Sequence, residues 1–107
     1  MFLINILLVD DHALFSKSLE IALSDYSEIE TFDSINDVSQ LDNYIVSKKP
    51  DIILMDEPFS ALDIQTRQQM ENEVLDIWMS QRKAVLFITH DLDEAIKLGD
   101  RIMIMKD

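Results

Sequence analysis

Acidic residues follow two apolar runs of the sequence, and their positions suggest a shared site. Asp10 and Asp11 come directly after the run Leu3–Val9, and Asp56 follows the run Asp51–Met55. If both runs are parallel strands, their carboxyl ends meet at one edge of a sheet and the three carboxylates crowd together. A hard cation with oxygen ligands relieves the repulsion in such a cluster. The sequence therefore predicts a weak Mg²⁺ site formed by Asp10, Asp11 and Asp56.

The elements that would position these residues are short apolar runs alternating with helical patterns. This alternation predicts an α/β fold: a three-layer, doubly wound, five-stranded parallel sheet. The five expected strands are Leu3–Val9, Glu28–Phe32, Asp51–Met55, Ala84–Thr89 and Arg101–Met105. Neither a repeat nor a Gly/Ser-rich linker interrupts the pattern, so residues 1–107 are expected to form a single domain.

Helical periodicity is clearest between the third and fourth expected strands. The apolar face of this helix comprises Met70, Val74, Ile77 and Trp78. Glu71 is expected to face solvent. In the next helix, Asp91 with Glu94 resembles a capping box, and the single glycine, Gly99, stands where a cap would end the helix.

Composition excludes several classes of partner. The 107 residues are 48% hydrophobic, which suits one soluble domain, and the net charge of −12 disfavours nucleic acid and anionic membranes. The absence of cysteine excludes disulfides and is compatible with a reducing cytoplasm. The apolar N-terminal run is too short to cross a membrane. We therefore expect a cytoplasmic location.

The first half of the chain, residues 1–56, resembles the receiver domain of bacterial response regulators. The resemblance is carried by Leu7–His12 and Pro50–Asp56. It implies that Asp56 accepts a phosphoryl group from a histidine kinase or a small phosphodonor, with Mg²⁺ neutralising the developing charge. It further implies that Thr89 and Lys106 hold the phosphoryl group. The alternative, that Thr89 only ends a strand and Lys106 is a solvated terminal residue, stays open.

The second half, residues 51–107, resembles the C-terminal part of an ABC transporter ATP-binding domain. Ile53–Pro58 matches a Walker B strand with its following glutamate, Phe59–Asp63 matches the D-loop, and Ile88–Asp91 matches the switch-histidine region. The resemblance implies that Glu57 polarises the attacking water and that His90 contacts the γ-phosphate.

The sequence lacks the phosphate-binding loop of such domains. A G-x-x-x-x-G-K-[ST] motif is absent, and one glycine in the whole chain cannot supply it. We therefore expect no ATP hydrolysis and no nucleotide binding, with Glu57 and His90 as vestigial catalytic residues.

These observations favour a designed chimeric scaffold, a single hybrid domain with a receiver-like half (1–56) and an ABC-ATPase-like half (57–107). It would bind Mg²⁺ weakly at most and has no certain partner. A phosphoacceptor receiver using Asp56 and an ATPase-like nucleotide-binding fragment are the alternatives. The favoured strand order is 2-1-3-4-5, as in flavodoxin-like folds. The P-loop-like alternative places the fourth strand between the first and the third.

Overall fold

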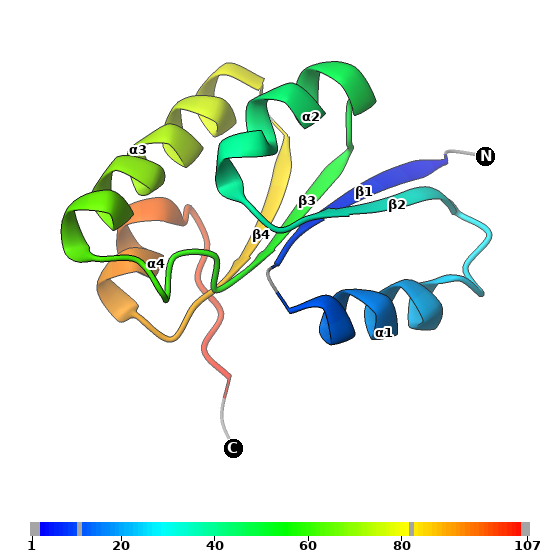
Figure 1. The fold of residues 1–107 in the computed structure, drawn as a ribbon, viewed down its shortest axis with the longest axis horizontal. Coiled ribbons are helices and arrows are strands. Elements are labelled where there is room, and N and C mark those ends of the chain that lie inside the picture. Colours follow the sequence, from blue (N-terminus) through cyan, green and yellow to red (C-terminus); the bar gives the residue numbers. More distant parts are fainter. Residues whose placement is uncertain (1–2, 11, 82, 106–107) are drawn as a thin grey trace.

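The computed structural model describes residues 3–10, 12–81 and 83–105, and its centre is a four-stranded parallel sheet in the order β2-β1-β3-β4 (Figure 1). The strands are β1 Ile4–Val9, β2 Ile29–Ile35, β3 Ile52–Asp56 and β4 Ala84–Ile88. The predicted α/β class is confirmed. The order of these four strands agrees with the favoured prediction.

Four α-helices connect or follow the strands in the described part of the chain. They are α1 Ala13–Leu23, α2 Leu41–Lys48, α3 Ile64–Gln81 and α4 Leu92–Leu98, with a 3₁₀ turn at Val38–Gln40 before α2. In Figure 1, α2 and α3 lie on one side of the sheet and α1 lies on the other, which gives three layers. Helix α4 is held against α3 by an ion pair of 3.1 Å between Lys97 Nζ and Glu71 Oε1.

The alternative strand order is wrong. It required β4 to separate β1 from β3, whereas Val9 of β1 pairs directly with Met55 of β3. Strand β4 lies outside β3, where Asp56 pairs with Ile88.

The predicted fifth strand is also absent from the described residues. Residues 99–105 carry no helix or strand, and the side chains of Ile102–Met105 are largely exposed. Parallel strands are stable when both of their faces are covered. In the described chain, no helix lies beyond α4 to cover the α1 side of such a strand, so a fifth strand would gain one ladder of hydrogen bonds while leaving one face in water.

The hydrophobic core lies between the sheet and the α2–α3 layer. Leu7 and Val9 of β1 and Ile53 and Met55 of β3 are buried on this face. The residues that cover them are Leu41 and Ile45 of α2, Phe59 of the loop after β3, and Val74 of α3. Because Leu41 and Ile45 are four residues apart, they lie on the same face of α2.

Helix α3 matches its predicted apolar face only in part. Val74 is buried, and Met70 and Ile77 pack against the core as expected. The prediction that Glu71 faces solvent is wrong, because this residue is only 6% exposed and lies between α3 and α4. A carboxylate can be buried there because the Lys97 ammonium group supplies its counter-charge.

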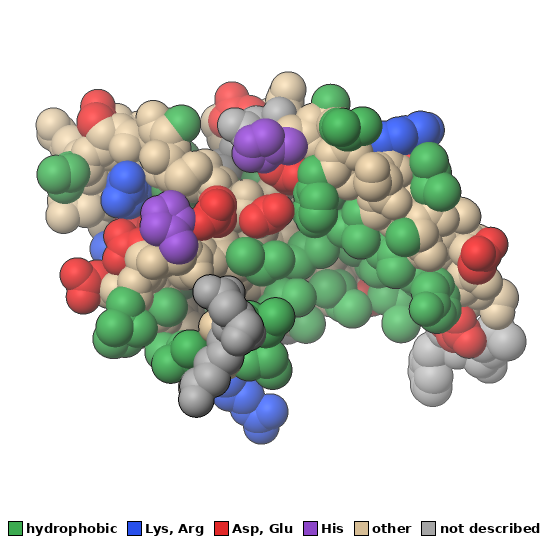
Figure 2. All heavy atoms as spheres, turned by 90° about the horizontal axis from the view of Figure 1, so that it is seen from below, with side chains coloured by type: hydrophobic (Ala, Val, Ile, Leu, Met, Phe, Trp, Pro, Cys, Tyr) green, Lys and Arg blue, Asp and Glu red, His purple; other side chains and the backbone are tan. Residues whose placement is uncertain are grey.

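The opposite face of the sheet is only partly covered. Alternate residues of β4 point to this side, and Leu86 and Ile88 are 59% and 42% exposed. Figure 2 shows hydrophobic side chains gathered on this face, where α1 covers the β1 side of the sheet but leaves the β4 side open.

Candidate functional site

The candidate site lies at the carboxyl edge of the sheet. The register of β1, β3 and β4 places Asp10 one residue beyond β1, Asp56 at the end of β3 and Thr89 one residue beyond β4. The strand ends therefore come together as the sequence predicted. Asp11 and Lys106 lie outside the described residues, so the parts of the predictions that rest on them stay predictions.

Asp10 is the most buried acidic residue of this edge. Its side chain is fully enclosed, and its Oδ1 accepts a hydrogen bond of 3.1 Å from the backbone N–H of His12 and lies 2.9 Å from His12 Nδ1. Its Oδ2 has no hydrogen-bond partner. A buried carboxylate oxygen without a hydrogen-bond partner is energetically costly, so this part of the edge is locally destabilised.

The predicted metal cluster is not assembled from the described residues alone. Within residues 3–10, 12–81 and 83–105, no group of three His, Cys, Asp or Glu side chains is arranged to hold a metal ion. Asp10 and Asp56 fit Mg²⁺ by the chemistry of their oxygens, but the third predicted ligand, Asp11, is not described. The magnesium site therefore stays a prediction.

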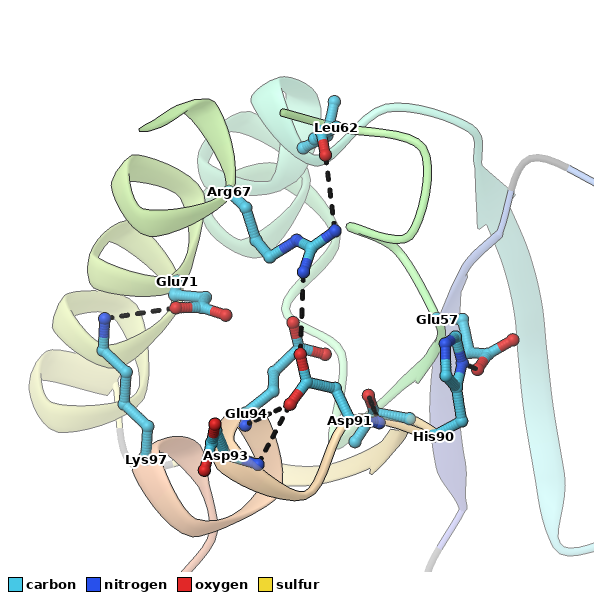
Figure 3. Close-up of polar contacts among 10 residues, drawn as sticks. Glu57, Leu62, Arg67, Glu71, His90, Asp91, Asp93, Glu94 and Lys97 are labelled. Carbon is cyan, nitrogen blue, oxygen red and sulfur yellow. Dashed lines mark hydrogen bonds and ion pairs between the residues drawn. The ribbon is translucent and has the colours of Figure 1, made fainter. Parts of the chain in front are cut away.

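Glu57 and His90 form the clearest polar pair at this edge. The Glu57 backbone has a positive φ of 44°, and its N–H donates a hydrogen bond of 2.8 Å to the Ile88 carbonyl of the neighbouring strand. This bend turns the side chain toward the residue two positions beyond Ile88, so that Glu57 Oε1 meets His90 Nδ1 (Figure 3). Two residues separated by 33 positions are thus in direct contact.

The electrostatics of the pair favour charge on both partners. The hydrogen bond to His90 holds the pKa of Glu57 below its ordinary value, and the same bond with the Glu57 carboxylate raises the pKa of His90. His90 is largely exposed, with 79% of its side-chain surface accessible. The sequence identified Glu57 and His90 as separate vestigial residues and did not predict their contact.

The segment that follows Glu57 is held by local hydrogen bonds. The Ser60 hydroxyl donates to the Glu57 carbonyl at 3.2 Å, which closes a turn. Asp63 then caps α3, because its Oδ1 accepts a hydrogen bond of 2.7 Å from the Thr66 N–H. That hydrogen bond also lowers the pKa of Asp63. The segment that resembles the D-loop therefore forms a tight connection from β3 to α3.

Thr89 is engaged with the start of α4. Its Oγ1 accepts a hydrogen bond of 3.0 Å from the Asp91 N–H. Asp91 is the N-cap of α4, and its Oδ1 accepts hydrogen bonds from the N–H groups of Asp93 and Glu94 at 3.0 and 3.2 Å. The predicted cap is thus observed for Asp91, and Gly99 stands at the predicted C-cap.

A partly buried polar cluster joins α3 to α4, and it was not predicted from the sequence. Arg67 lies 3.6 Å from Asp91, Lys97 pairs with Glu71, and Glu94 is only 6% exposed (Figure 3). Burial, with Glu71 as a further cause, raises the pKa of Glu94, against a hydrogen bond from Thr89 that lowers it. The overlooked signal was the position of Glu71, between Met70 and Val74 on the inner side of α3.

Comparison with known proteins links about half of the chain to ABC transporter ATP-binding proteins. It is 53% identical over 62 residues to a glycine betaine/carnitine transport ATP-binding protein of Listeria monocytogenes, a match that covers 58% of the chain and 16% of the relative. It is 55% identical over 62 residues to a glycine betaine transport ATP-binding protein of Bacillus subtilis, covering 58% and 15%.

A third relative extends this likeness to an archaeon. The chain is 50% identical over 60 residues to an uncharacterized ABC transporter ATP-binding protein of Methanocaldococcus jannaschii, covering 56% of the chain and 22% of the relative. The chain thus spans less than a quarter of the length of each of these relatives. No protein-family model matches it. None of the helices in the described part of the chain is long and apolar enough to cross a membrane.

Proposed function

We propose that this chain is an ATPase-like nucleotide-binding fragment that carries the hydrolytic end of an ABC-type site without its phosphate-binding loop. The observation that carries the proposal is the contact between Glu57 and His90, which joins the segments that resemble Walker B and the switch histidine. The identity of about 50% with ABC transporter ATP-binding proteins supports it.

The chemistry of the pair suits the γ-phosphate end of a nucleotide. A lowered pKa keeps Glu57 ionised, so its carboxylate can accept a hydrogen bond from a water molecule and orient it for attack. A raised pKa increases the protonated fraction of His90 at a given pH. The imidazolium group can then donate a hydrogen bond to a phosphate oxygen. Asp56 would help to hold Mg²⁺, which would neutralise negative charge on the phosphate groups.

The chain alone is proposed to be inactive as an ATPase. Phosphoryl transfer depends on positioning, and positioning needs backbone N–H groups and a lysine around the β- and γ-phosphates. The sequence has a single glycine and no Walker A motif. Tight nucleotide binding and hydrolysis would therefore require a phosphate-binding loop supplied from outside these 107 residues.

Two measurements test the proposal. Calorimetry and phosphate-release assays with Mg·ATP should show neither tight binding nor turnover for the isolated chain. NMR titration of His90 with Mg·triphosphate should still shift its ring resonances, and Glu57→Gln should reduce the shift. Turnover that Glu57→Gln abolishes would refute the claim of inactivity. An unmoved His90 at millimolar triphosphate would refute the assignment of the site.

A second function, phosphoacceptor activity, has its own supporting observation. Asp56 ends β3 next to β1, whose following residue is the buried Asp10, and the observed order β2-β1-β3-β4 agrees with the receiver-like order. Treatment with Mg²⁺ and acetyl phosphate should then add one phosphoryl group, detected by mass spectrometry, to the wild type and not to Asp56→Asn. An unmodified wild type would remove this candidate, and with it a histidine kinase as partner.

The origin of the chain is a separate proposal. We infer a designed, cytoplasmic chimera in which a receiver-like segment of residues 1–56 shares one core with an ABC-ATPase-like segment of residues 57–107. Identity over about half of the chain supports this inference, as does the shared core of Val9, Met55 and Val74. Urea unfolding should give coincident transitions for Trp78 fluorescence and far-ultraviolet circular dichroism. Two separate transitions would contradict a single hybrid domain.

A further inference from the structure

The side of the sheet that faces α1 is left open over β3 and β4. Leu8, Leu54 and Leu86 pair across three neighbouring strands in one row, and burial decreases along this row from β1 through β3 to β4. Ile88, two residues after Leu86, lies on the same side of β4 and is also exposed. Leu54, Leu86 and Ile88 are called the open face below, and Figure 2 shows the hydrophobic side chains on this side of the molecule.

The width of the open face fits one helix. Neighbouring strands lie about 4.8 Å apart, so β3 and β4 together present a strip about 10 Å wide. An α-helix with its side chains has a diameter of about 10 Å or slightly more. On the other side of the sheet two helices, α2 and α3, cover the strands, whereas on this side the described residues supply α1 alone (Figure 1). One further helix would complete the layer.

A contiguous apolar surface of this kind is typical of an interaction site. Parallel sheets are normally covered on both faces, and a soluble protein rarely leaves such a surface in contact with water unless a partner covers it. The exposed apolar residues elsewhere, such as Val46 of α2, lie on the outer sides of helices. The open face is therefore the apolar surface of the described chain that is best suited to a partner.

The charge around the open face selects a basic partner. Glu57 follows β3 and Asp93 follows β4, both at the carboxyl edge of the sheet. Figure 2 shows acidic side chains along one border of the hydrophobic surface. Lys83 lies at the opposite end of β4. The whole chain carries a net charge of −12, which attracts polycations and opposes both a second copy of the chain and an anionic membrane.

We propose that the open face binds an amphipathic α-helix of a partner protein, with a polar face rich in lysine and arginine. Apolar side chains three and four positions apart on that helix contact Leu54, Leu86 and Ile88, and its basic side chains lie nearest to the acidic carboxyl edge. The proposal depends neither on nucleotide binding nor on phosphoacceptor activity.

The test is an NMR titration of the ¹⁵N-labelled chain with a synthetic peptide of about 15 residues, built from Ala, Leu and Lys with every Leu on one helical face. Two control peptides separate the two requirements. One has the same composition in scrambled order and lacks an apolar face, and the other carries Glu in place of Lys. The basic amphipathic peptide should shift the amide resonances of Leu54, Leu86 and Ile88 in a saturable way. It should bind at least roughly tenfold more tightly than either control.

Two matched variants locate the peptide on the sheet. Leu86→Ser should weaken binding of the basic amphipathic peptide roughly fivefold, because it removes apolar area that the helix covers. Val46→Ser makes a similar change on α2 and should leave binding unchanged. Leu86 and Val46 are 59% and 70% exposed, so neither substitution removes a core residue. Far-ultraviolet circular dichroism checks that both variants are folded.

Each part of the proposal has an outcome that would overturn it. Equal binding of the scrambled peptide would show that no apolar helical face is recognised, and equal binding of the acidic peptide would show that charge does not select the partner. Equal weakening by Leu86→Ser and Val46→Ser would place the peptide elsewhere. Sedimentation of the peptide-free chain tests the other occupant: association that rises with protein concentration and is abolished by Leu86→Ser would assign the open face to a second copy.

Discussion

The two faces of the sheet differ sharply in how deeply their side chains are buried. Adjacent rows of paired residues, one on each face, show the difference. On the α2–α3 side, Leu7 and Ile53 are paired neighbours that are 1% and 0% exposed. On the α1 side, the paired row Leu8, Leu54 and Leu86 runs from 0% exposure at Leu8, through partial burial, to 59% at Leu86. The same strands supply both rows, so the covering layer decides what is buried.

The helices explain the difference. Helices α2 and α3 place Leu41, Ile45 and Val74 on the sheet. In helix α1 the buried residue is Ser16, which is 9% exposed, whereas the aromatic Phe15 is 40% exposed. Two helices therefore cover one face of the sheet, and a single loosely packed helix covers part of the other.

Truncation of one residue on each face should give the largest contrast. Ile53→Ala, on the covered face, should lower the free energy of unfolding by about 3 kcal/mol, because it removes buried methyl groups and leaves a cavity. Leu86→Ala, in the open row, should cost less than about 1 kcal/mol, since its side chain already contacts water. Urea unfolding of both variants measures the two values.

Equal losses of unfolding free energy for these two substitutions would contradict the difference in coverage between the two faces of the sheet. They would mean that the open face is covered in solution, for example by the exposed apolar segment Ile102–Met105 or by a second copy of the chain. Sedimentation at two protein concentrations separates these explanations, because only self-association depends on concentration.

Helix α4 extends the covered side, since its Leu98 packs against the core, and its N-cap gives the next test. Asp91→Ala removes two hydrogen bonds to backbone N–H groups and an ion pair with Arg67. The expected loss is about 1 kcal/mol of unfolding free energy. Asp93 is exposed and lies two residues after Asp91. Asp93→Ala removes the same charge but no side-chain cap, so it should lower the unfolding free energy less. A larger effect of Asp93→Ala would assign the stabilisation to charge at the helix start.

The sequence predicted the positions of the helices and strands better than it predicted which of their apolar faces are covered by other elements. Strand and helix positions follow from apolar periodicity, so the runs around Val9, Met55 and Phe87 were placed correctly. Periodicity reports which face of an element is apolar, but it does not report whether another element will cover that face. For this reason Arg101–Met105 was expected to be a strand, although in the structure it has no partner on β4 and no covering helix.

The candidate site shows the same limit. The positions of Asp10, Asp56 and Thr89 at one edge follow from strand ends alone. The contact of Glu57 with His90 depends on a backbone bend at φ 44°, and the burial of Glu71 depends on how α4 docks. Neither local propensity nor spacing encodes such tertiary geometry.

The pH dependence of stability tests the burial of Glu94 at the junction between α3 and α4. Burial raises its pKa above the ordinary value of 4.5, so the folded state holds this proton when the unfolded state has released it. Its contribution to stability is therefore fully present below pH 4.5 and is lost as the pH rises through the raised folded value. The charged groups nearest to it are Glu71, Asp91 and, through Glu71, Lys97.

Glu94→Gln should remove that pH dependence. The amide keeps a neutral side chain at the site, so the unfolding free energy of the variant, relative to the wild type, should increase as the pH rises from 4.5 toward 8. Denaturant unfolding at a series of pH values measures the difference. Glu73→Gln, on an exposed part of α3, serves as the control. Parallel pH profiles for wild type and Glu94→Gln would show that Glu94 is ionised alike in both states.

The smallest structural effect is expected at the Glu57–His90 pair, which packs against neither face of the sheet. Both side chains are partly or largely exposed, and an exposed ion pair adds little to stability. Glu57→Gln should therefore leave the unfolding midpoint nearly unchanged while lowering the pKa of His90 toward its ordinary value of 6.5, as measured by the ring proton shifts in NMR. His12, the other histidine, has only a weaker Coulombic interaction with Glu57, so its ring protons should shift less than those of His90. An unchanged pKa of His90 in this variant would show that the contact does not persist in solution, and the proposed nucleotide site would then lose its main support.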